Sequence, residues 1–421
     1  MVHRAAMKLA LPAFQFRFMA AAGNVIFPGN FHPVGTQREV ENVAGQMGDG
    51  TADGDGGCWL VVGGSGGFGS AARLALGLDR GADTLSVSFD AAPDFSSRNK
   101  IRQIGSPGYH RNLAIERALR QRGRIAESHN GDAFDPALRA QVLSTLRERF
   151  GGRKLNGLVW ALAAPRAVDP RTGARVASAL KPLGLPALIK TFAGRKGDEP
   201  AEIVEFKIEP GTPEEAVHTQ FVMGGGILEQ WVEDLLAADG LAPGFTLLSI
   251  SYRGNPLNEA IYRNGLIGLA KADLEFRTHA VGRVLADRLG GRALSVEGPA
   301  VVTEASGGIP GVPLYLALLA DVMRDRFENP VASMRRLFRE HLAPGCEPQL
   351  DDEGLLRMDD RELEASVQAE MKARYAAHPV GATLDNALYE DFMRAYARTR
   401  GFDVAGVDYD AEFDVEDICR A

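Results

Sequence analysis

Cysteine is scarce in this chain, whose 421 residues include Cys58, Cys346 and Cys419 and no other cysteine. No two of them form a Cys-x-x-Cys pair, which argues against a disulfide framework or a zinc site and favours a reducing compartment. A basic excess is also missing: the net charge is −8, whereas surfaces that bind nucleic acid are basic. No stretch approaches the roughly 20 apolar residues of a membrane span. We therefore expect a cytoplasmic protein without a metal site, a nucleic-acid partner or a membrane span.

Acidic residues are absent from positions 1–22, which carry three Lys or Arg residues among many apolar ones. This composition is similar to that of a targeting segment, but Lys8 and Arg17 interrupt the apolar stretch that a signal peptide requires. We therefore expect residues 1–22 to be an extension outside the fold, with Met19 as an alternative start. Residues 23–421 are expected to form one large domain.

Glycine, by contrast, is abundant (48 residues), and one cluster of glycines follows a continuous apolar run at 59–62. Such a run is typical of a strand buried in a parallel sheet. Gly64, Gly66 and Gly69 then match G-x-G-x-x-G, and a helix-forming stretch follows at 70–78. Glycines at this spacing allow a tight turn and let backbone N–H groups approach a pyrophosphate at the start of a helix.

An acidic residue completes this pattern. The expected second strand, at 84–89, ends at Asp90, which stands at about the 20-residue spacing of a ribose-binding acid. A carboxylate there accepts hydrogen bonds from a ribose 2′-hydroxyl and repels a 2′-phosphate. A glycine-rich turn alone is as often without a ligand as with one. The order of strand, turn, helix, strand and acid instead predicts a dinucleotide site that favours NADH over NADPH.

Strands and helices continue to alternate after Asp90. The alternation predicts an α/β fold with a Rossmann-type doubly wound parallel sheet. A stretch rich in proline, glycine and charge at 164–213 is expected to be a substrate-binding insertion beside the site, and 312–400 a helical C-terminal region. The remaining expected elements are strands at 25–27, 125–128, 158–162 and 246–251, helices at 109–122, 136–150 and 213–238, and a long unpatterned connection at 91–108.

A tyrosine and a lysine stand nine residues apart after the expected strand at 246–251. A phenol beside an ammonium suits a reductase, because the cation lowers the pKa of the phenol and also binds a nicotinamide ribose. On a straight helix, however, nine residues place Tyr262 and Lys271 on opposite faces. They converge only if Tyr262 lies in a loop before the helix and Lys271 within it, a break that Gly265 and Gly268 permit. Taken alone, a pair at this spacing more often has a structural role.

Many dispersed motifs, in order, resemble one protein family. The chain is similar to the FabV type of enoyl-acyl-carrier-protein reductase and to trans-2-enoyl-CoA reductases, large relatives of the short-chain dehydrogenases marked by a Tyr-x8-Lys pair. The resemblance extends over nearly the whole chain after Ala22. Its motifs lie at 32–35, 63–69, 105–109, 130–134, 162–163, 180–184, 251–252, 262 with 271, 301–303, 309–310 and 407–409.

The resemblance implies an activity and three residue roles. The activity is NADH-dependent reduction of the 2,3 double bond of a trans-2-enoyl thioester, carried by coenzyme A or by an acyl carrier protein, as in fatty acid synthesis. Tyr262 is implied to be the proton donor, Lys271 to contact NADH, and Tyr252 to hydrogen-bond the thioester carbonyl. No flavin or metal is required, since the conjugated carbonyl accepts the electrons. We expect a monomer.

Two sets of lining residues are also implied. A helix starting near Val312 would supply the apolar wall of the acyl pocket from Leu314, Tyr315 and Leu318. NADH would be lined by Gly63, Gly64, Ser65, Gly66, Gly67, Phe68, Phe89, Asp90, Asp132, Ala133, Leu162, Ala163, Lys271, Val301, Val302 and Thr303.

The chain departs from the family at the glycine loop and beside the substrate. At 63–68, Gly-Gly-Ser-Gly-Gly-Phe replaces the usual Gly-Ala-Ser-Thr-Gly-Tyr, and Asp90 replaces a Glu. Ala164 stands where Ser is common, and 253–255 replaces a more apolar stretch. These changes leave open a related reductase that acts on a ketone or on a polyketide-like enoyl intermediate. A non-catalytic dinucleotide-binding sensor is a further alternative, against which the tyrosine–lysine pair argues.

Overall fold

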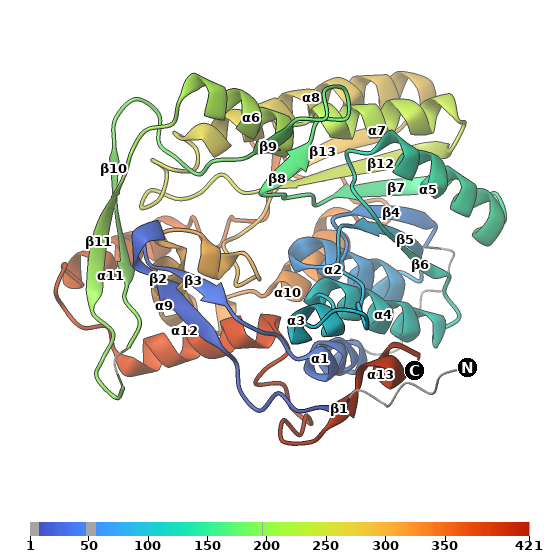
Figure 1. The fold of residues 1–421 in the computed structure, drawn as a ribbon. Coiled ribbons are helices and arrows are strands. Elements are labelled where there is room, and N and C mark those ends of the chain that lie inside the picture. Colours follow the sequence, from blue (N-terminus) through green and yellow to red (C-terminus); the bar gives the residue numbers. More distant parts are fainter. Residues whose placement is uncertain (1–7, 48–55, 196, 421) are drawn as a thin grey trace.

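A parallel sheet lies at the centre of the computed structural model, which describes residues 8–47, 56–195 and 197–420 (Figure 1). Within these residues the sheet has seven strands in the order β14-β13-β12-β7-β4-β5-β6. The order grows outward in both directions from β4 and β7, which makes the gap between their carboxyl ends the switch point where doubly wound sheets bind ligands. The Rossmann-type fold is thus confirmed. The strands are β4 (Cys58–Val62), β5 (Asp83–Ser88), β6 (Ala126–Asn130), β7 (Leu155–Trp160), β12 (Leu241–Ser251), β13 (Arg292–Glu297) and β14 (Leu355–Arg357).

Two layers of helices cover the sheet because successive side chains of a strand point to opposite faces. Trp59 and Val61 of β4 pack into one apolar core, and Leu60 and Val62 pack into another. The first core, below the sheet in Figure 1, contains α1 (Pro33–Gln46), α2 (Gly67–Leu74), α4 (Pro107–Arg120) and α10 (Pro330–Arg336). The second, above it, contains α5 (Pro136–Arg149), α6 (Pro213–Met223), α7 (Gly226–Ala237) and α8 (Leu266–Leu289).

A third apolar cluster, the α9 core, forms the left side of the molecule in Figure 1. Its centre is α9 (Val312–Met323), packed against α11 (Ala365–Ala377), α12 (Asn386–Thr399) and the hairpin of β10 (Ala187–Phe192) and β11 (Ile203–Ile208). Tyr262 belongs to this core. The chain that leaves the sheet after β12 therefore carries Tyr262 into the α9 core before it returns as α8.

The expected insertion at 164–213 consists of two antiparallel hairpins outside the main sheet, β8 (Arg166–Val168) with β9 (Arg175–Ala177) and β10 with β11. Its middle part borders the start of α8: the N–H of Leu266 donates to the carbonyl of Lys181 at 2.9 Å. The single helix expected at 213–238 is two helices, α6 and α7, which meet at Gly224 and Gly225. A Cβ at Gly225 would lie 2.8 Å from the Arg277 side chain, so the break lets this corner approach α8 closely.

The first segment of the chain is where the expectation was wrong. Residues 8–22 are part of the fold: β1 (Lys8–Leu9) pairs with β15 (Phe413–Asp414), and β2 (Phe16–Met19) pairs with β3 (Val25–Pro28). The reason is an alternation of aromatic residues, since Phe14 contacts Phe402 and Phe18 contacts Phe192, with ring centroids 5.5 and 6.2 Å apart. The rest of the expected extension, 1–7, lies outside the described residues.

Short helices complete the described chain. The connection at 91–108, expected to be unpatterned, contains α3 (Lys100–Ile104), and α13 (Val415–Arg420) follows β15. None of the described helices is long and apolar enough to cross a membrane.

Candidate active site

The glycine loop between β4 and α2 folds into a turn that only glycine allows at its key positions. Gly63 has a φ of +85°, and its N–H donates to the carbonyl of Val87 at 2.8 Å. A Cβ at Gly69 would lie 2.1 Å from the carbonyl oxygen of Gly63. A Cβ at Gly64 would lie 2.2 Å from Oγ of Ser86. The loop is therefore packed from beneath by backbone and by β5, and α2 starts directly over the end of β4.

The start of α2 suits a pyrophosphate. Gly66 precedes the helix and has no side chain to cap it, so the first N–H groups are available to a ligand. The atoms nearest to a Cβ placed on Gly66 are Nη1 of Arg111 at 3.6 Å and Oε1 of Glu304 at 3.7 Å. A Cβ at Gly66 would make only ordinary van der Waals contacts, so Gly66 is not crowded, and both a guanidinium and a carboxylate border it.

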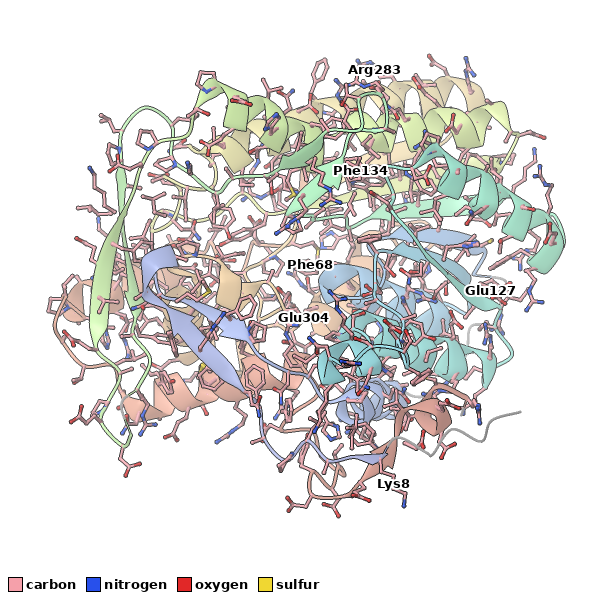
Figure 2. All side chains as sticks on the ribbon, in the orientation of Figure 1. Lys8, Phe68, Glu127, Phe134, Arg283 and Glu304 are labelled. Carbon is pink, nitrogen blue, oxygen red and sulfur yellow. The ribbon has the colours of Figure 1, made fainter. Side chains whose placement is uncertain are left out.

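Arg111 was not predicted, and it joins three parts of the chain at this loop. Its Nη1 donates to the carbonyl of Ser65 at 2.5 Å and to Oε1 of Glu304 at 2.6 Å, and its Nη2 donates to the carbonyl of Thr399 at 3.0 Å. Figure 2 shows Phe68 and Glu304 near the middle of the molecule, between the sheet and the α9 core. A lone arginine inside α4 carries no sequence signal for this position.

Asp90 follows β5 and faces the first turn of α4. Its Oδ1 accepts from Oγ of Ser106 at 3.0 Å, and a Cβ at Gly108 would lie 2.1 Å from the same oxygen. Its Oδ2 is buried and has no hydrogen-bond partner among the residues that the structure describes. Phe89, beside it, is 83% exposed. The carboxylate can accept a further hydrogen bond, as a ribose contact requires, and its role stays a prediction.

The other expected NADH residues fall at the ends of neighbouring strands. A Cβ at Gly63 would lie 3.0 Å from the N atom of Leu162, and a Cβ at Gly67 would lie 3.6 Å from Cγ2 of Thr303. The segments at 162–163 and 301–303 therefore meet the glycine loop. The pair at 132–133 follows β6 and makes structural hydrogen bonds: the carbonyl of Ala133 accepts from Nε1 of Trp231 at 2.9 Å.

Tyr262 and Lys271 occupy the positions that their spacing requires. Tyr262 lies in the turn before α8, and Lys271 lies within α8. A Cβ at Gly268 would lie 2.5 Å from the carbonyl of Tyr262, so the first turn of the helix packs directly on this turn. The expected break between the two residues is confirmed.

The structure brings Tyr262 together with Tyr252, which follows β12. Their ring centroids are 5.1 Å apart and the rings are nearly perpendicular, at 84°. Burial, and the nearby charge of Glu362, raise the pKa of both hydroxyls. The expected lowering of the phenol pKa is therefore wrong for Tyr262, because loss of hydration disfavours the phenolate. Both tyrosines are protonated at neutral pH and can donate.

Glu297 ends β13 opposite Ser251, the residue before Tyr252, in the sheet register. It is fully buried, and neither carboxylate oxygen has a hydrogen-bond partner among the described residues. Burial, and to a smaller extent the charge of Glu275, raise its pKa to about 7 against the opposing effect of Arg253 and Lys271. Burial in turn lowers the pKa of Lys271, while Glu297 and Glu275 favour its charged form.

Glu362 is a second buried carboxyl group, and it accepts hydrogen bonds from Tyr252 and Tyr315. It accepts from the N–H of Ala300 at 2.6 Å, from the hydroxyl of Tyr315 at 2.7 Å and from the hydroxyl of Tyr252 at 3.4 Å. Burial raises the pKa of Glu362 to about 7. It stands 110 residues after Tyr252, in a turn with no motif, so the sequence offered no signal for it.

Comparisons with known proteins agree with this geometry. Residues 103–343 match a family model described as the trans-2-enoyl-CoA reductase catalytic region, and residues 21–94 match the NAD(P)H binding domain of trans-2-enoyl-CoA reductase. The chain belongs to the trans-2-enoyl-CoA reductase family. A third model, described as an enoyl reductase FAD binding domain, matches residues 350–413 of this reductase-family chain.

Individual relatives match nearly the whole chain. The NADH-type enoyl-acyl-carrier-protein reductase of Opitutus terrae is 36% identical over 357 residues, which is 84% of this chain and 87% of that protein. The structure of Clostridium acetobutulicum trans-2-enoyl-CoA reductase in complex with NADH aligns with a TM-score of 0.86 and 31% identity, covering 98% of this chain and 99% of that one. The Treponema denticola enzyme in complex with NAD aligns with a TM-score of 0.83 and 32% identity, covering 96% and 98%.

The third model raises the question of a flavin, and its residues do not fit one. Helix α12 begins after Asp385, whose carboxylate accepts from the N–H of Ala387 at 2.7 Å and so occupies the positive helix end that a flavin pyrophosphate would need. Glu364, which precedes α11, pairs with Arg326. Arg357, in the same segment, pairs with Asp351 at 3.2 Å and with Asp359 at 2.7 Å. This segment therefore does not offer a flavin pyrophosphate a free helix start or an unpaired Arg357.

The residues expected to border an acyl chain lie on α9. Leu314, Tyr315 and Leu318 are buried in the α9 core together with Tyr262. The hydroxyl of Tyr315 is engaged by Glu362, so this side chain also supports the polar network. The pocket-lining role of the three residues stays a prediction.

Proposed function

We propose that this protein reduces the carbon–carbon double bond of trans-2-enoyl thioesters, with NADH as the hydride donor. The observation that carries the proposal is the edge-to-face meeting of Tyr252 and Tyr262 beyond β12, next to the helix that holds Lys271. The open start of α2 supports dinucleotide binding beside it. The similar proteins, an NADH-type enoyl-acyl-carrier-protein reductase and a trans-2-enoyl-CoA reductase in complex with NADH, support the same activity.

The side chains divide the chemistry among them. NADH, when bound, supplies the hydride that adds to the β-carbon. Tyr252 donates a hydrogen bond to the thioester carbonyl oxygen, where negative charge develops as the double bond is reduced. Tyr262, kept protonated by its raised pKa, is the proton donor that completes the reduction. Lys271 contacts NADH, and Glu297 and Glu275 favour the charged form of its ammonium against the effect of burial.

The acyl group of the substrate can be carried by coenzyme A or by an acyl carrier protein. Coenzyme A and acyl carrier protein present the same phosphopantetheine arm, so the proposal includes both. We further propose that the protein works as a monomer in the cytoplasm, where fatty acid synthesis would use it. The scarcity of cysteine supports a reducing compartment.

The test is oxidation of NADH, followed by its absorbance, with crotonyl-CoA and with dodecenoyl-CoA. Wild type is compared with Tyr262→Phe, and NADH binding is measured for both. We expect turnover in wild type and its loss in Tyr262→Phe with unchanged NADH binding. Reduction of a 3-ketoacyl thioester but of neither enoyl substrate would instead support the ketone-reducing alternative. NADH binding without turnover of any thioester would support a sensor.

A further inference from the structure

The hydroxyl of Tyr252 is surrounded by amide groups whose orientation the backbone determines. Oδ1 of Asn255 accepts from the N–H of Leu257 at 2.9 Å, so its Nδ2 must face the other way, and it donates to Tyr252 at 3.0 Å. Oδ1 of Asn258 accepts from the N–H of Asn255 at 2.8 Å, and its Nδ2 lies 3.5 Å from the same hydroxyl. Because a backbone N–H is always a donor, neither amide can be turned around without losing a buried hydrogen bond.

The local fold holds both amides in place. Gly254 has a φ of +85°, and a Cβ there would lie 2.6 Å from Oδ1 of Asn258. Asn255 is 3% exposed, and Asn258 is also buried.

Because two amide N–H groups donate to the hydroxyl oxygen of Tyr252, this hydroxyl can act toward a further partner only as a hydrogen-bond donor. Its lone pairs face N–H groups, so its own proton must be donated. The resting acceptor is Oε1 of Glu362 at 3.4 Å. This distance is longer than the 2.6 and 2.7 Å at which Glu362 accepts from Ala300 and Tyr315. The hydrogen bond from Tyr252 to Glu362 is therefore weak, and the hydroxyl can donate to another acceptor instead.

We propose that Asn255, assisted by Asn258, is a positioning residue that keeps Tyr252 a hydrogen-bond donor to the thioester carbonyl oxygen. The inference rests on the proposed function, because that function supplies the carbonyl. Asn255 does not touch the reacting atoms and acts through Tyr252. The 3.0 Å and 3.5 Å distances predict that Asn255 contributes more than Asn258.

Asn255→Asp and Asn258→Asp isolate this effect. Each keeps the oxygen that accepts the backbone N–H and replaces the N–H donor facing Tyr252 with a second acceptor, which attracts the proton of Tyr252. We expect Asn255→Asp to lower kcat about tenfold, the value of one hydrogen bond, and Asn258→Asp to lower it less. The Kd for NADH is expected to stay at the wild-type value in both.

A second background separates positioning from a structural role. Each substitution is repeated in Tyr252→Phe, where there is no hydroxyl to orient, and we expect no further fall in kcat there. Asn255→Ser is the uncharged companion variant: its hydroxyl can still accept from Leu257 but is too short to reach Tyr252. If a thermal melt shows that Asn255→Asp does not fold, Asn255→Ser still tests the role of Asn255.

The outcomes are distinct. Absence of wild-type turnover would remove the proposed function itself. Wild-type turnover with an unchanged kcat in Asn255→Asp and Asn255→Ser would overturn the positioning role alone. The same fractional loss of kcat in wild type and in Tyr252→Phe would also overturn the positioning role, because the effect would then not depend on the hydroxyl of Tyr252.

Discussion

The two halves of the site are built in opposite ways. The nucleotide side is built around one continuous stretch, β4 to Asp90, whose turn depends on backbone and on missing Cβ atoms, while Arg111 and the segments at 162–163 and 301–303 border it. The tyrosine side gathers Tyr252, Tyr262, Tyr315 and Glu362 from segments spread over 110 residues, and it depends on buried carboxyl groups. The difference teaches that one site can be steric and local on one side and electrostatic and long-range on the other.

This contrast predicts different ways to break each side. Crowding should disable the nucleotide side, because close backbone contacts and the hydrogen bond from Arg111 to Ser65 leave the glycine loop no room to move. Changes of protonation should act on the tyrosine side, where Glu297 and Glu362 both have a pKa near neutrality. The three substitutions below follow from the largest expected effect to the smallest.

Gly69→Ala should cause the largest loss. The added Cβ would meet the carbonyl oxygen of Gly63 at 2.1 Å, and backbone on both sides leaves nothing flexible to move. We expect NADH affinity to fall on the order of a thousandfold, about 4 kcal/mol, at every pH. Equilibrium titration of NADH checks this. Gly226→Ala is the matched control: no atom lies within 4 Å of its Cβ position in α7, and near-normal affinity is expected there.

Glu297→Gln should remove a pH-dependent loss of stability. The folded-state pKa of Glu297 is about 7, above its ordinary value of 4.5. The folded state therefore holds the proton more tightly, and the stabilisation this gives is complete below pH 4.5 and lost as pH rises through 7. The loss is on the order of 3 kcal/mol. The amide cannot ionise, so thermal melts should show a variant that gains on wild type as pH rises from about 4.5 to 8. A difference in Tm between the two proteins that stays constant from about pH 4.5 to 8 would contradict the raised pKa of Glu297.

Glu362→Gln should have a smaller effect, confined to the tyrosine side. An amide has one acceptor oxygen, which cannot satisfy the N–H of Ala300 and the hydroxyl of Tyr315 as the carboxylate does. We expect kcat to fall about tenfold, about 1.4 kcal/mol, with the NADH Kd unchanged. Steady-state kinetics and NADH titration measure the two. Glu364→Gln, a nearby side chain that is 43% exposed, should leave both values near wild type. A matching loss of NADH affinity in Glu362→Gln would show that the two sides are not separate.

The same contrast explains how far the sequence could predict the molecule. The strand, glycine turn and acid of the nucleotide side are consecutive, so their spacing carried the prediction. The nine-residue interval between Tyr262 and Lys271 likewise predicted a break before α8, on the condition that the two side chains converge. These signals lie within single segments of the chain.

What could not be predicted depends on the order of strands. Glu297 and Glu362 look like ordinary surface acids in the sequence, and their burial results from β13 lying between β12 and β14 and from the turn after β14 reaching Tyr252. The prediction for residues 8–22 was wrong for a similar reason. Phe14, Phe16 and Phe18 alternate as in a strand, but this strand is stable only because it pairs with β3 and packs on the α9 core.

The pairing of β1 with β15 has a consequence for re-engineering the chain. Lys8 lies directly opposite Asp414, so the two ends of the described fold are held side by side. A short linker could join them and the chain could be reopened elsewhere. The turn at Gly151 and Gly152 is suited to this, since both are left-handed and no atom lies within 4 Å of either Cβ position. A circularly permuted enzyme of this kind would begin with β7 and keep both halves of the site intact.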